Sequence, residues 1–195
     1  MGLPRKLKNM NAFVDGESYL GVIAEFEEPQ LAIATEEWRG GGMIGPVMID
    51  MGLEAMEATL KMGGHEASLI RKFGTTQVDG VRLRLVGAYQ QDNGASPQAV
   101  EVVLGGRFTE INPNTAKPGE DTEHDYTVAV SYYRRVVDGR PEVEIDMVAG
   151  TFIVDGVNRY EESCAGRRVG TGGPVWFLSL ARLSAPHNRP SSSTR

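Results

Sequence analysis

Apolar and polar residues alternate with a period of two along much of the first 160 residues. This period is typical of β-strands that bury one face. The alternation predicts strands over residues 19–26, 31–36, 56–62, 81–85, 126–132 and 142–147, with a longer apolar strand over residues 99–111. Gly105–Gly106 inside the long run predicts a bend or bulge. Asp138–Gly139, between the last two strands, predicts a tight hairpin turn.

One short helix is predicted over about residues 65–73. Leu69, Ile70 and Phe73 share one helical face there, and glycines stand before and after the segment. A single helix among so many strands favours a mainly β fold. We predict a β-sandwich or partly closed barrel with this one α-helix on its flank.

Charge and composition both change near Tyr160. Residues 1–160 hold 15 Lys and Arg against 24 Asp and Glu, whereas residues 161–195 hold five Arg against two Glu. The second segment is also rich in Gly, Ser and Pro. We therefore predict a main domain over residues 1–160 and a basic C-terminal extension over residues 161–195. The extension carries an apolar patch, Trp176–Leu180, which is either part of a flexible tail or docks on a neighbouring subunit.

Composition argues against several classes of function. The net charge is −6 and the pI is about 5.2, so no overall positive field attracts nucleic acid or anionic membrane. A single cysteine, Cys164, excludes an internal disulfide and any multi-thiolate zinc site. No apolar run approaches the ~20 residues that span a bilayer, and no signal peptide is recognisable. We expect no membrane contact and no cofactor.

Candidates for catalysis and metal binding are weak. His65–Glu66 has no second histidine four residues on, as a zinc-protease helix would. His124 lies among Asp121, Glu123 and Asp125, a pattern more typical of a solvated turn than of a metal site. A small β-barrel enzyme or binding module would need convergent polar groups in a pocket. We expect no enzyme and no metal.

Several phrases resemble the major tail tube proteins of contractile-tailed phages and of R-type pyocins. They run in the family's order over about residues 3–158, and none of them is a catalytic signature. They are Leu3–Asn9 with Asn11–Gly16, Pro29 and Leu31 leading into Glu37–Met43, Ile49–Ala58, Val128–Tyr133, and Val137–Gly139 with Glu144–Asp146.

The resemblance implies an assembly. Subunits of this family form hexameric rings whose inner strands join into one barrel, and the rings stack into a tube inside a contractile sheath. The implied partners are further copies of the chain, the tail sheath, a tape-measure protein in the lumen, and the baseplate and tail terminator proteins. Genomic DNA would pass through without specific binding. The expected location is the virion tail, assembled in the cytoplasm of the host bacterium. The alternative is the tube of a pyocin-like or secretion-type injection device.

Two sets of residues are expected to serve this assembly. The glycine-rich loop between two strands is predicted to reach neighbouring subunits, as the family's long loop does, and its candidates are Arg39, Gly40, Gly41, Gly42, Met43 and Ile44. Carboxylates on alternate strand faces are predicted to face the lumen and keep DNA from the wall, and these are Glu36, Glu57, Glu142, Glu144 and Asp146.

Overall fold

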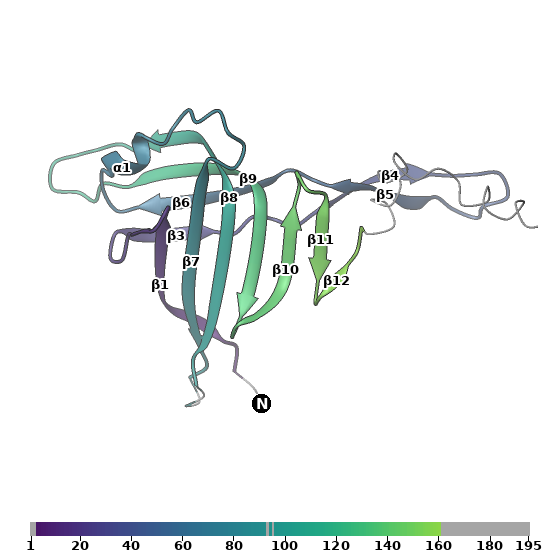
Figure 1. Cartoon of the computed structure of the whole chain (residues 1–195), viewed down its shortest axis with the longest axis horizontal. Coiled ribbons are helices and arrows are strands. Elements are labelled where there is room, and N and C mark those ends of the chain that lie inside the picture. The colour runs from purple at the N-terminus through teal and green to yellow at the C-terminus, as the bar shows by residue number, and fades with distance from the viewer. Residues whose placement is uncertain (1–2, 93, 95, 161–195) are drawn as a thin grey trace, which may run out of the picture. The chain divides into compact units, whose positions relative to one another are not determined.

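The computed structural model describes residues 3–92, 94 and 96–160, which form twelve strands and one short helix (Figure 1). The strands are β1 (Lys6–Val14), β2 (Glu17–Ser18), β3 (Ile23–Glu27), β4 (Ile33–Trp38), β5 (Val47–Leu53), β6 (Met56–Met62), β7 (Val81–Gln90), β8 (Gln98–Pro113), β9 (His124–Val137), β10 (Arg140–Asp146), β11 (Thr151–Val154) and β12 (Val157–Asn158), and the helix is α1 (Ala67–Ile70). This composition confirms the predicted mainly β class. The predicted extension over residues 161–195 lies outside the described residues.

The large sheet is organised by β9, whose two edges have different partners. One edge pairs with β8 from His124 to Val137. The other edge pairs with β6 as far as Val130 and then with β10 from Tyr132 onward. The sheet therefore forks at β9. One limb continues to β6 and β3 and the other to β10, β11 and β12, while β8 leads back through β7 and β1 to β2.

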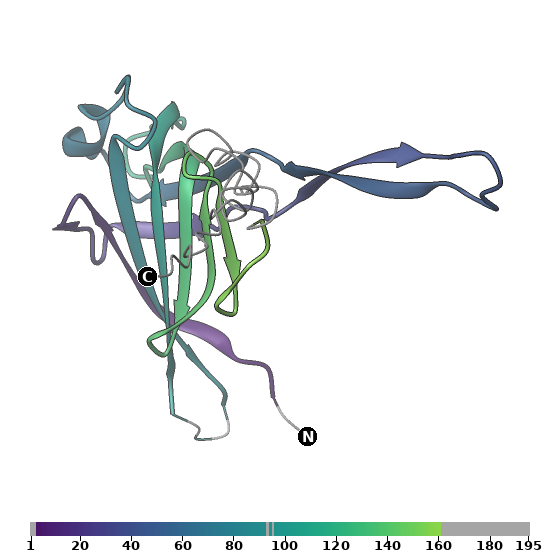
Figure 2. The same ribbon diagram turned by 45° about the vertical axis from the view of Figure 1, so that its right-hand side comes forward.

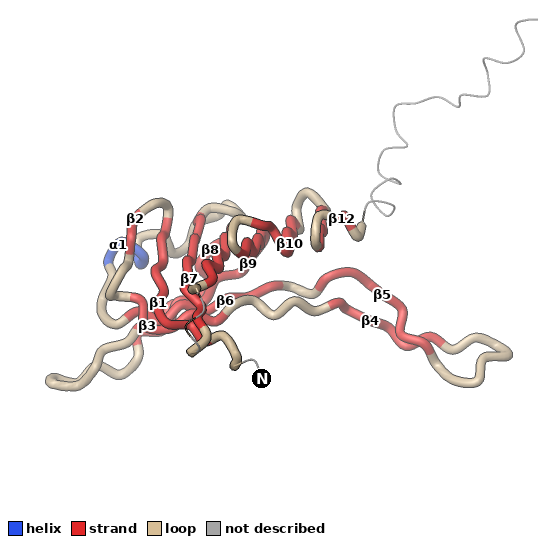
Figure 3. The backbone as a smooth tube through the Cα atoms, turned by 90° about the horizontal axis from the view of Figure 1, so that it is seen from below, coloured by secondary structure: helices blue, strands red, loops and turns tan. Residues whose placement is uncertain are grey.

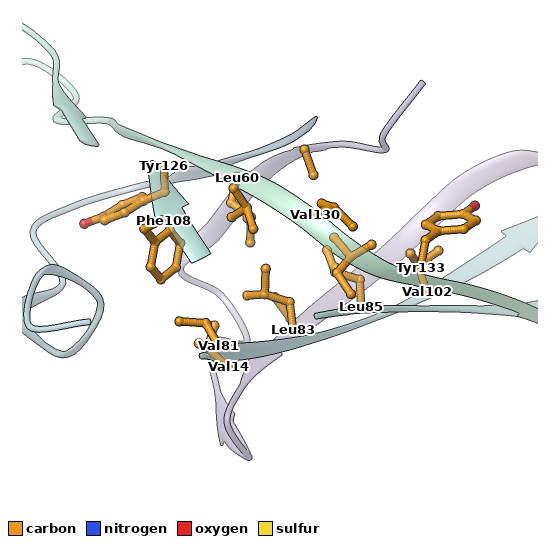
Figure 4. Packing of buried hydrophobic residues seen from close by; sticks show 14 of the residues in the cluster. Val14, Leu60, Val81, Leu83, Leu85, Val102, Phe108, Tyr126, Val130 and Tyr133 are labelled. Carbon is orange, nitrogen blue, oxygen red and sulfur yellow. The ribbon is translucent and has the colours of Figure 1, made fainter. Parts of the chain in front are cut away.

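The hydrophobic core lies between the limbs of this forked sheet. Every second residue of β6, from Met56 to Met62, is buried, and Leu83 and Leu85 of β7 are buried in the same cluster. Figure 4 shows Leu60 and Val130 facing Val81 and Leu83 across the core. Each fully buried aliphatic side chain stabilises the fold by about 1.5–3 kcal/mol. Among the described strands the sheet stays open, because β12, β2 and β3 end its paths without pairing to one another.

The sharp bend of β8 depends on a glycine pair. The register of β8 against β9 shifts between Gly105 and Gly106, which confirms the predicted bulge. A Cβ atom on Gly106 would clash with the carbonyl oxygen of Ala129 on β9. Glycine is therefore required where the two backbones approach. The bend lets β8 stay paired with β9 on both sides of the fork. The predicted Asp138–Gly139 turn also forms, with positive φ angles of 49° and 80°.

The structure differs from the predicted elements at several places. The strand expected over residues 19–26 was wrong in its first half, because Gly21 turns the chain with a φ of 81° and only Ile23–Glu27 pairs as β3. The helix α1 is shorter than expected, although turn hydrogen bonds continue to Phe73. Alternation did not reveal β1, β5, β11 or β12. Their residues are mostly exposed or half-buried, so their sequences carry little of the buried-face signal.

Replacing Gly106 by alanine tests the bulge. We expect Gly106→Ala to lower the free energy of unfolding by about 1–3 kcal/mol, because the added methyl group must displace the β9 backbone. Gly41→Ala is the matched control, since a Cβ atom there meets no other atom within 4 Å. Urea denaturation of the two variants measures the difference, and equal midpoints would contradict this account of the bend.

Candidate assembly surfaces

The β4–β5 hairpin is set apart from the rest of the fold. The two strands pair with each other and, among the described strands, with no other. Figures 2 and 3 show the hairpin projecting from the forked sheet as a long two-stranded arm. An isolated two-stranded ribbon is at best marginally stable in water. The hairpin therefore needs support from its own subunit, from a neighbour, or from both.

One face of the hairpin is apolar and exposed. Trp38 lies directly opposite Val47, and Ile49 lies opposite Glu36, so these side chains share one face, with Met51 next along β5. The exposed fraction is 58% for Trp38 and 61% for Met51. We call Trp38, Val47, Ile49 and Met51 the apolar hairpin face. Exposed apolar patches of this kind on a soluble domain mark interaction sites.

The predicted loop, Arg39–Pro46, forms the tip of this arm. Ile44 is fully exposed there, and its role as an apolar anchor stays a prediction. Met43 is instead engaged within the loop, because its Sδ atom accepts a hydrogen bond from the backbone N–H of Gly40 at 3.0 Å. Sequence reasoning found the tip and missed the apolar hairpin face behind it. The period-two run of Val47, Ile49 and Met51 after the glycines is a signal that could have revealed it.

The root of the hairpin is tied to β9 through a partly buried polar contact. Glu28 follows β3, and Arg135 of β9 donates from Nη1 to both of its carboxylate oxygens, at 2.8 and 3.1 Å. The Tyr133 hydroxyl lies 3.5 Å from the same carboxylate. Burial, and then the charge of Glu28, raise the pKa of Tyr133 to about 12. Where the arm leaves the domain, the N–H of Glu54 donates to the carbonyl oxygen of Ala32 and closes the ribbon.

A second contact holds the middle of the arm. The Tyr160 hydroxyl donates to the Asp50 carboxylate, with distances of 3.0 and 3.1 Å to its two oxygens. The Tyr160 ring packs against Phe152 of β11, with 5.7 Å between the ring centroids. Asp50 lies opposite Thr35, on the face of the hairpin away from Trp38. This second face, which also carries the exposed Met48, is therefore held by its own subunit at Asp50, whereas the described residues show no such contact for the apolar hairpin face.

The five predicted lumen carboxylates lie on different surfaces. Glu36 is on the hairpin, and Glu57 is on β6 opposite Ala129 of β9. Glu142 lies 3.3 Å from Nε of Arg135 and so joins the contact at the hairpin root. Only Glu144 and Asp146 share a face of the sheet, on β10 opposite Arg134 and Tyr132 of β9. The structure brings these two together and separates the other three from them.

The histidine and acidic side chains of the described residues were the sequence candidates for catalysis and metal binding. In residues 3–160, apart from 93 and 95, no three His, Cys, Asp or Glu side chains gather as a metal cage. His65 and His124 contact each other edge to face, with ring centroids 5.8 Å apart. No helix in the described part of the chain is long and apolar enough to cross a bilayer.

The family model described as phage tail tube protein FII matches residues 4–165. The chain is 41% identical to the tail tube protein of Escherichia phage P2 over 165 residues, which cover 83% of this chain and 96% of that protein. It is 37% identical to the major tail tube protein of Serratia phage KSP20, covering 83% and 94% of the two chains. The match ends five residues beyond the predicted domain boundary at residue 160.

A similar fold occurs in a solved structure. A chain from the extended sheath–tube complex of the extracellular contractile injection system PVC superposes with a TM-score of 0.51. The superposition covers 69% of this chain and 91% of that one, at 13% sequence identity. At this identity the likeness concerns the fold.

Removing one hydroxyl tests the contact in the middle of the arm. In Tyr160→Phe the ring contact with Phe152 remains while the hydrogen bonds to Asp50 are lost, at a cost of about 1 kcal/mol. We expect amide hydrogen exchange in β4 and β5 to accelerate about fivefold, with unchanged exchange in β7–β9. Tyr132→Phe is the control, because it removes a hydroxyl–carboxylate hydrogen bond to Glu144 on β10 and none to the hairpin. Unchanged exchange in the hairpin of Tyr160→Phe would contradict the proposed support.

Alkaline titration tests the contact at the root. Because the folded-state pKa of Tyr133 is raised, its neutral hydroxyl stabilises the fold below about pH 10, and this contribution is lost as the pH rises toward 12. We expect a tyrosinate absorbance component with a midpoint of about 12, which Tyr133→Phe removes. Glu28→Gln should move this midpoint downward, because it removes the charge that opposes ionisation. A Glu28→Gln midpoint that stays in place would show that this charge does not act on Tyr133.

Proposed function

Because this chain belongs to the phage tail tube protein family, we propose that it builds the tube of a contractile tail. In this proposal hexameric rings stack into a hollow tube inside the sheath, and genomic DNA leaves the virion through the lumen. The observation that carries the proposal is the collinear match over residues 4–165 to tail tube proteins. The subunit is a structural component, and we assign it no catalytic role.

Free strand edges support ring formation. The outer edge of β1 is paired with β2 at Phe13 and Val14, and Ala12 accepts a hydrogen bond from the N–H of Tyr19. Among the described strands, residues 6–11 of β1 have no partner on this edge. At the opposite end of the same sheet, β12 is only two residues long. Exposed edges favour pairing with another chain. Joining the two ends of the sheet around a ring would satisfy both edges and continue the sheet into a barrel.

The hairpin supports contact between copies. Its apolar face and Ile44 are exposed, and Asp50 on its other face is held by Tyr160 of the same subunit. We assign Arg39–Ile44 and the apolar hairpin face to an interface with a neighbouring subunit. A head-to-tail contact between two different surfaces of identical subunits forms a ring if its rotation closes and an open filament if it does not. In our proposal the hairpin contact is of the open kind and stacks one ring on the next.

The face of the sheet that carries Glu144 and Asp146 is our candidate for the channel wall. It is the broad side of β7–β10 that points away from the core, and a joined ring of such sheets would present this side to the lumen. A tape-measure protein and then DNA would pass along it. Glu36, Glu57 and Glu142 lie elsewhere in the subunit. The proposal for the lumen therefore keeps only Glu144 and Asp146.

The further partners follow from the proposed place of the tube. The sheath surrounds it, the baseplate and the terminator meet its two ends, and assembly takes place in the cytoplasm of the host bacterium. A pyocin-like device would use the same subunit design. The two relatives reported above both come from phages, which favours a phage tail.

Loss of the apolar tip tests the assembly. We expect the purified chain to form rings or tubes in negative-stain micrographs, and Ile44→Asp to remain folded but unassembled, because burying a carboxylate at an apolar interface is costly. Ile44→Val keeps an apolar tip and should still assemble. A wild-type chain that stays monomeric under all conditions would contradict the proposed function. Normal tubes from Ile44→Asp would contradict only the role of the tip.

A further inference from the structure

The proposed channel wall carries nearly equal numbers of positive and negative side chains. We call the side of β7–β10 that points away from the core the outer sheet face. Its position follows from the ladder, in which Arg84, Val103, Arg134 and Glu144 lie directly across from one another on successive strands. The charged residues of this face are Arg82, Arg84, Glu101, Arg134, Glu144 and Asp146 and, beyond the bulge at Gly105–Gly106, Arg107, Glu110 and Asp125. Four cations against five carboxylates give this face a net charge of −1.

Two of the arginines are held by carboxylates on adjacent strands. Nε of Arg84 on β7 lies 2.6 Å from Oε1 of Glu101 on β8. Nε of Arg134 on β9 lies 3.9 Å from Oε2 of Glu144 on β10. The Tyr132 hydroxyl donates to the other oxygen of Glu144 at 2.8 Å and fixes the position of that carboxylate. Each pair therefore bridges neighbouring strands on the exposed side of the sheet.

Asp146 has a different role on the same face. Its Oδ1 atom accepts hydrogen bonds from the backbone N–H groups of Val148, at 2.9 Å, and Ala149, at 2.7 Å. Among the described residues it forms no ion pair with an arginine. The face therefore contains carboxylates of equal charge in two settings, two paired with arginine and one engaged by a turn.

Unpaired arginines on such a wall would hold DNA. A guanidinium group binds phosphate oxygens with two parallel hydrogen bonds. Copies of the same arginine would recur along the tube and contact many phosphates of one duplex at once, which multiplies weak contacts into strong retention. Simple repulsion of DNA needs a strongly negative wall, and the outer sheet face, with four arginines against five carboxylates, supplies little net negative charge.

We propose that Glu101 and Glu144 mask Arg84 and Arg134 from DNA phosphates, so that only Arg82 and Arg107, which have no carboxylate partner among the described residues, remain open to DNA on this face. This inference rests on the proposed function, in which the outer sheet face lines the channel. The carboxylates matter through the arginines that they cover, and their own repulsion of DNA is secondary. The inference applies to any polyanion with a regular phosphate backbone that passes through the channel.

The orientation of the face is tested first and separately. Val103 lies between Arg84 and Arg134 on this face, so Val103→Cys, in a chain with Cys164→Ser, places a thiol on the wall. A small maleimide should label this thiol in free subunits and in tubes. A maleimide on a bulky polyethylene glycol should label only the free subunits. Labelling of intact tubes by the bulky reagent would show that the face is not luminal and would overturn the proposal while leaving the tube function intact.

The masking is then tested by removing single charges in phage particles. We expect Glu101→Gln with Glu144→Gln to slow triggered DNA release more than about tenfold at about 0.05 M salt, and much less at about 0.2 M, because phosphate contacts weaken steeply with salt. Adding Arg84→Gln and Arg134→Gln to this variant should restore the rate. Asp146→Asn is the matched control, since it removes a charge from the same face, keeps the acceptor oxygen and uncovers neither paired arginine.

The outcomes separate masking from repulsion. If Asp146→Asn slows release as much as Glu144→Gln does, net charge governs the wall and masking is wrong. Unchanged release in Glu101→Gln with Glu144→Gln would also overturn the proposal. Should those particles fail to assemble, retention of the free subunits on heparin gives a second measurement. The Glu101→Gln, Glu144→Gln subunit should then elute at higher salt than Asp146→Asn, and elution at the same salt would refute the masking.

Discussion

The architecture depends on the shared edge of β9. One edge of this strand is hydrogen-bonded to β8 throughout, and the other is divided between β6 and β10. A strand can satisfy only one partner at each position of an edge, so the sheet has to fork where β6 ends and β10 begins. The bulge at Gly105–Gly106 lies opposite this change of partner and lets β8 follow β9 through the bend. The core fills the space that the fork encloses.

The fork also determines where the hairpin leaves the domain. The β4–β5 arm is inserted between β3 and β6, the two strands of one limb, so its root lies beside the core side of β9. Arg135 can therefore hold Glu28 at the root. The other limb ends at Tyr160, which reaches Asp50 in the middle of the arm. A long ribbon is thus oriented by both limbs before any neighbour binds, which lowers the conformational entropy that assembly must overcome.

The two exposed faces obey different physical rules. Removing water from the apolar hairpin face lowers the free energy of the assembly. This suits the permanent contact between subunits that we propose. The outer sheet face pairs two of its arginines, Arg84 and Arg134, with carboxylates on adjacent strands. Such exposed ion pairs add little stability, and their main effect is on what the surface binds. In our proposal, one subunit thus presents one surface that binds a neighbouring copy and one that does not retain DNA.

Much of the class and family could be read from the sequence alone. Alternation revealed the buried strands, such as Met56–Met62, because every second residue there faces the core. Glycines marked the bulge and the tip of the hairpin, since no other residue allows such close backbone approach or positive φ so readily. Collinear phrases identified the tube family.

Only the tertiary structure decided which residues share a surface. Glu36, Glu57 and Glu144 look equivalent as alternate positions of strands, yet they lie on the hairpin, on β6 and on β10. The pairing of Glu28 with Arg135 joins residues 107 positions apart, and no local pattern encodes such a contact. Strand alternation determines which side chains point away from the core, because the period of two is a local property of the chain. Which outward side chains then meet depends on strand order and register, which are set by long-range hydrogen bonding.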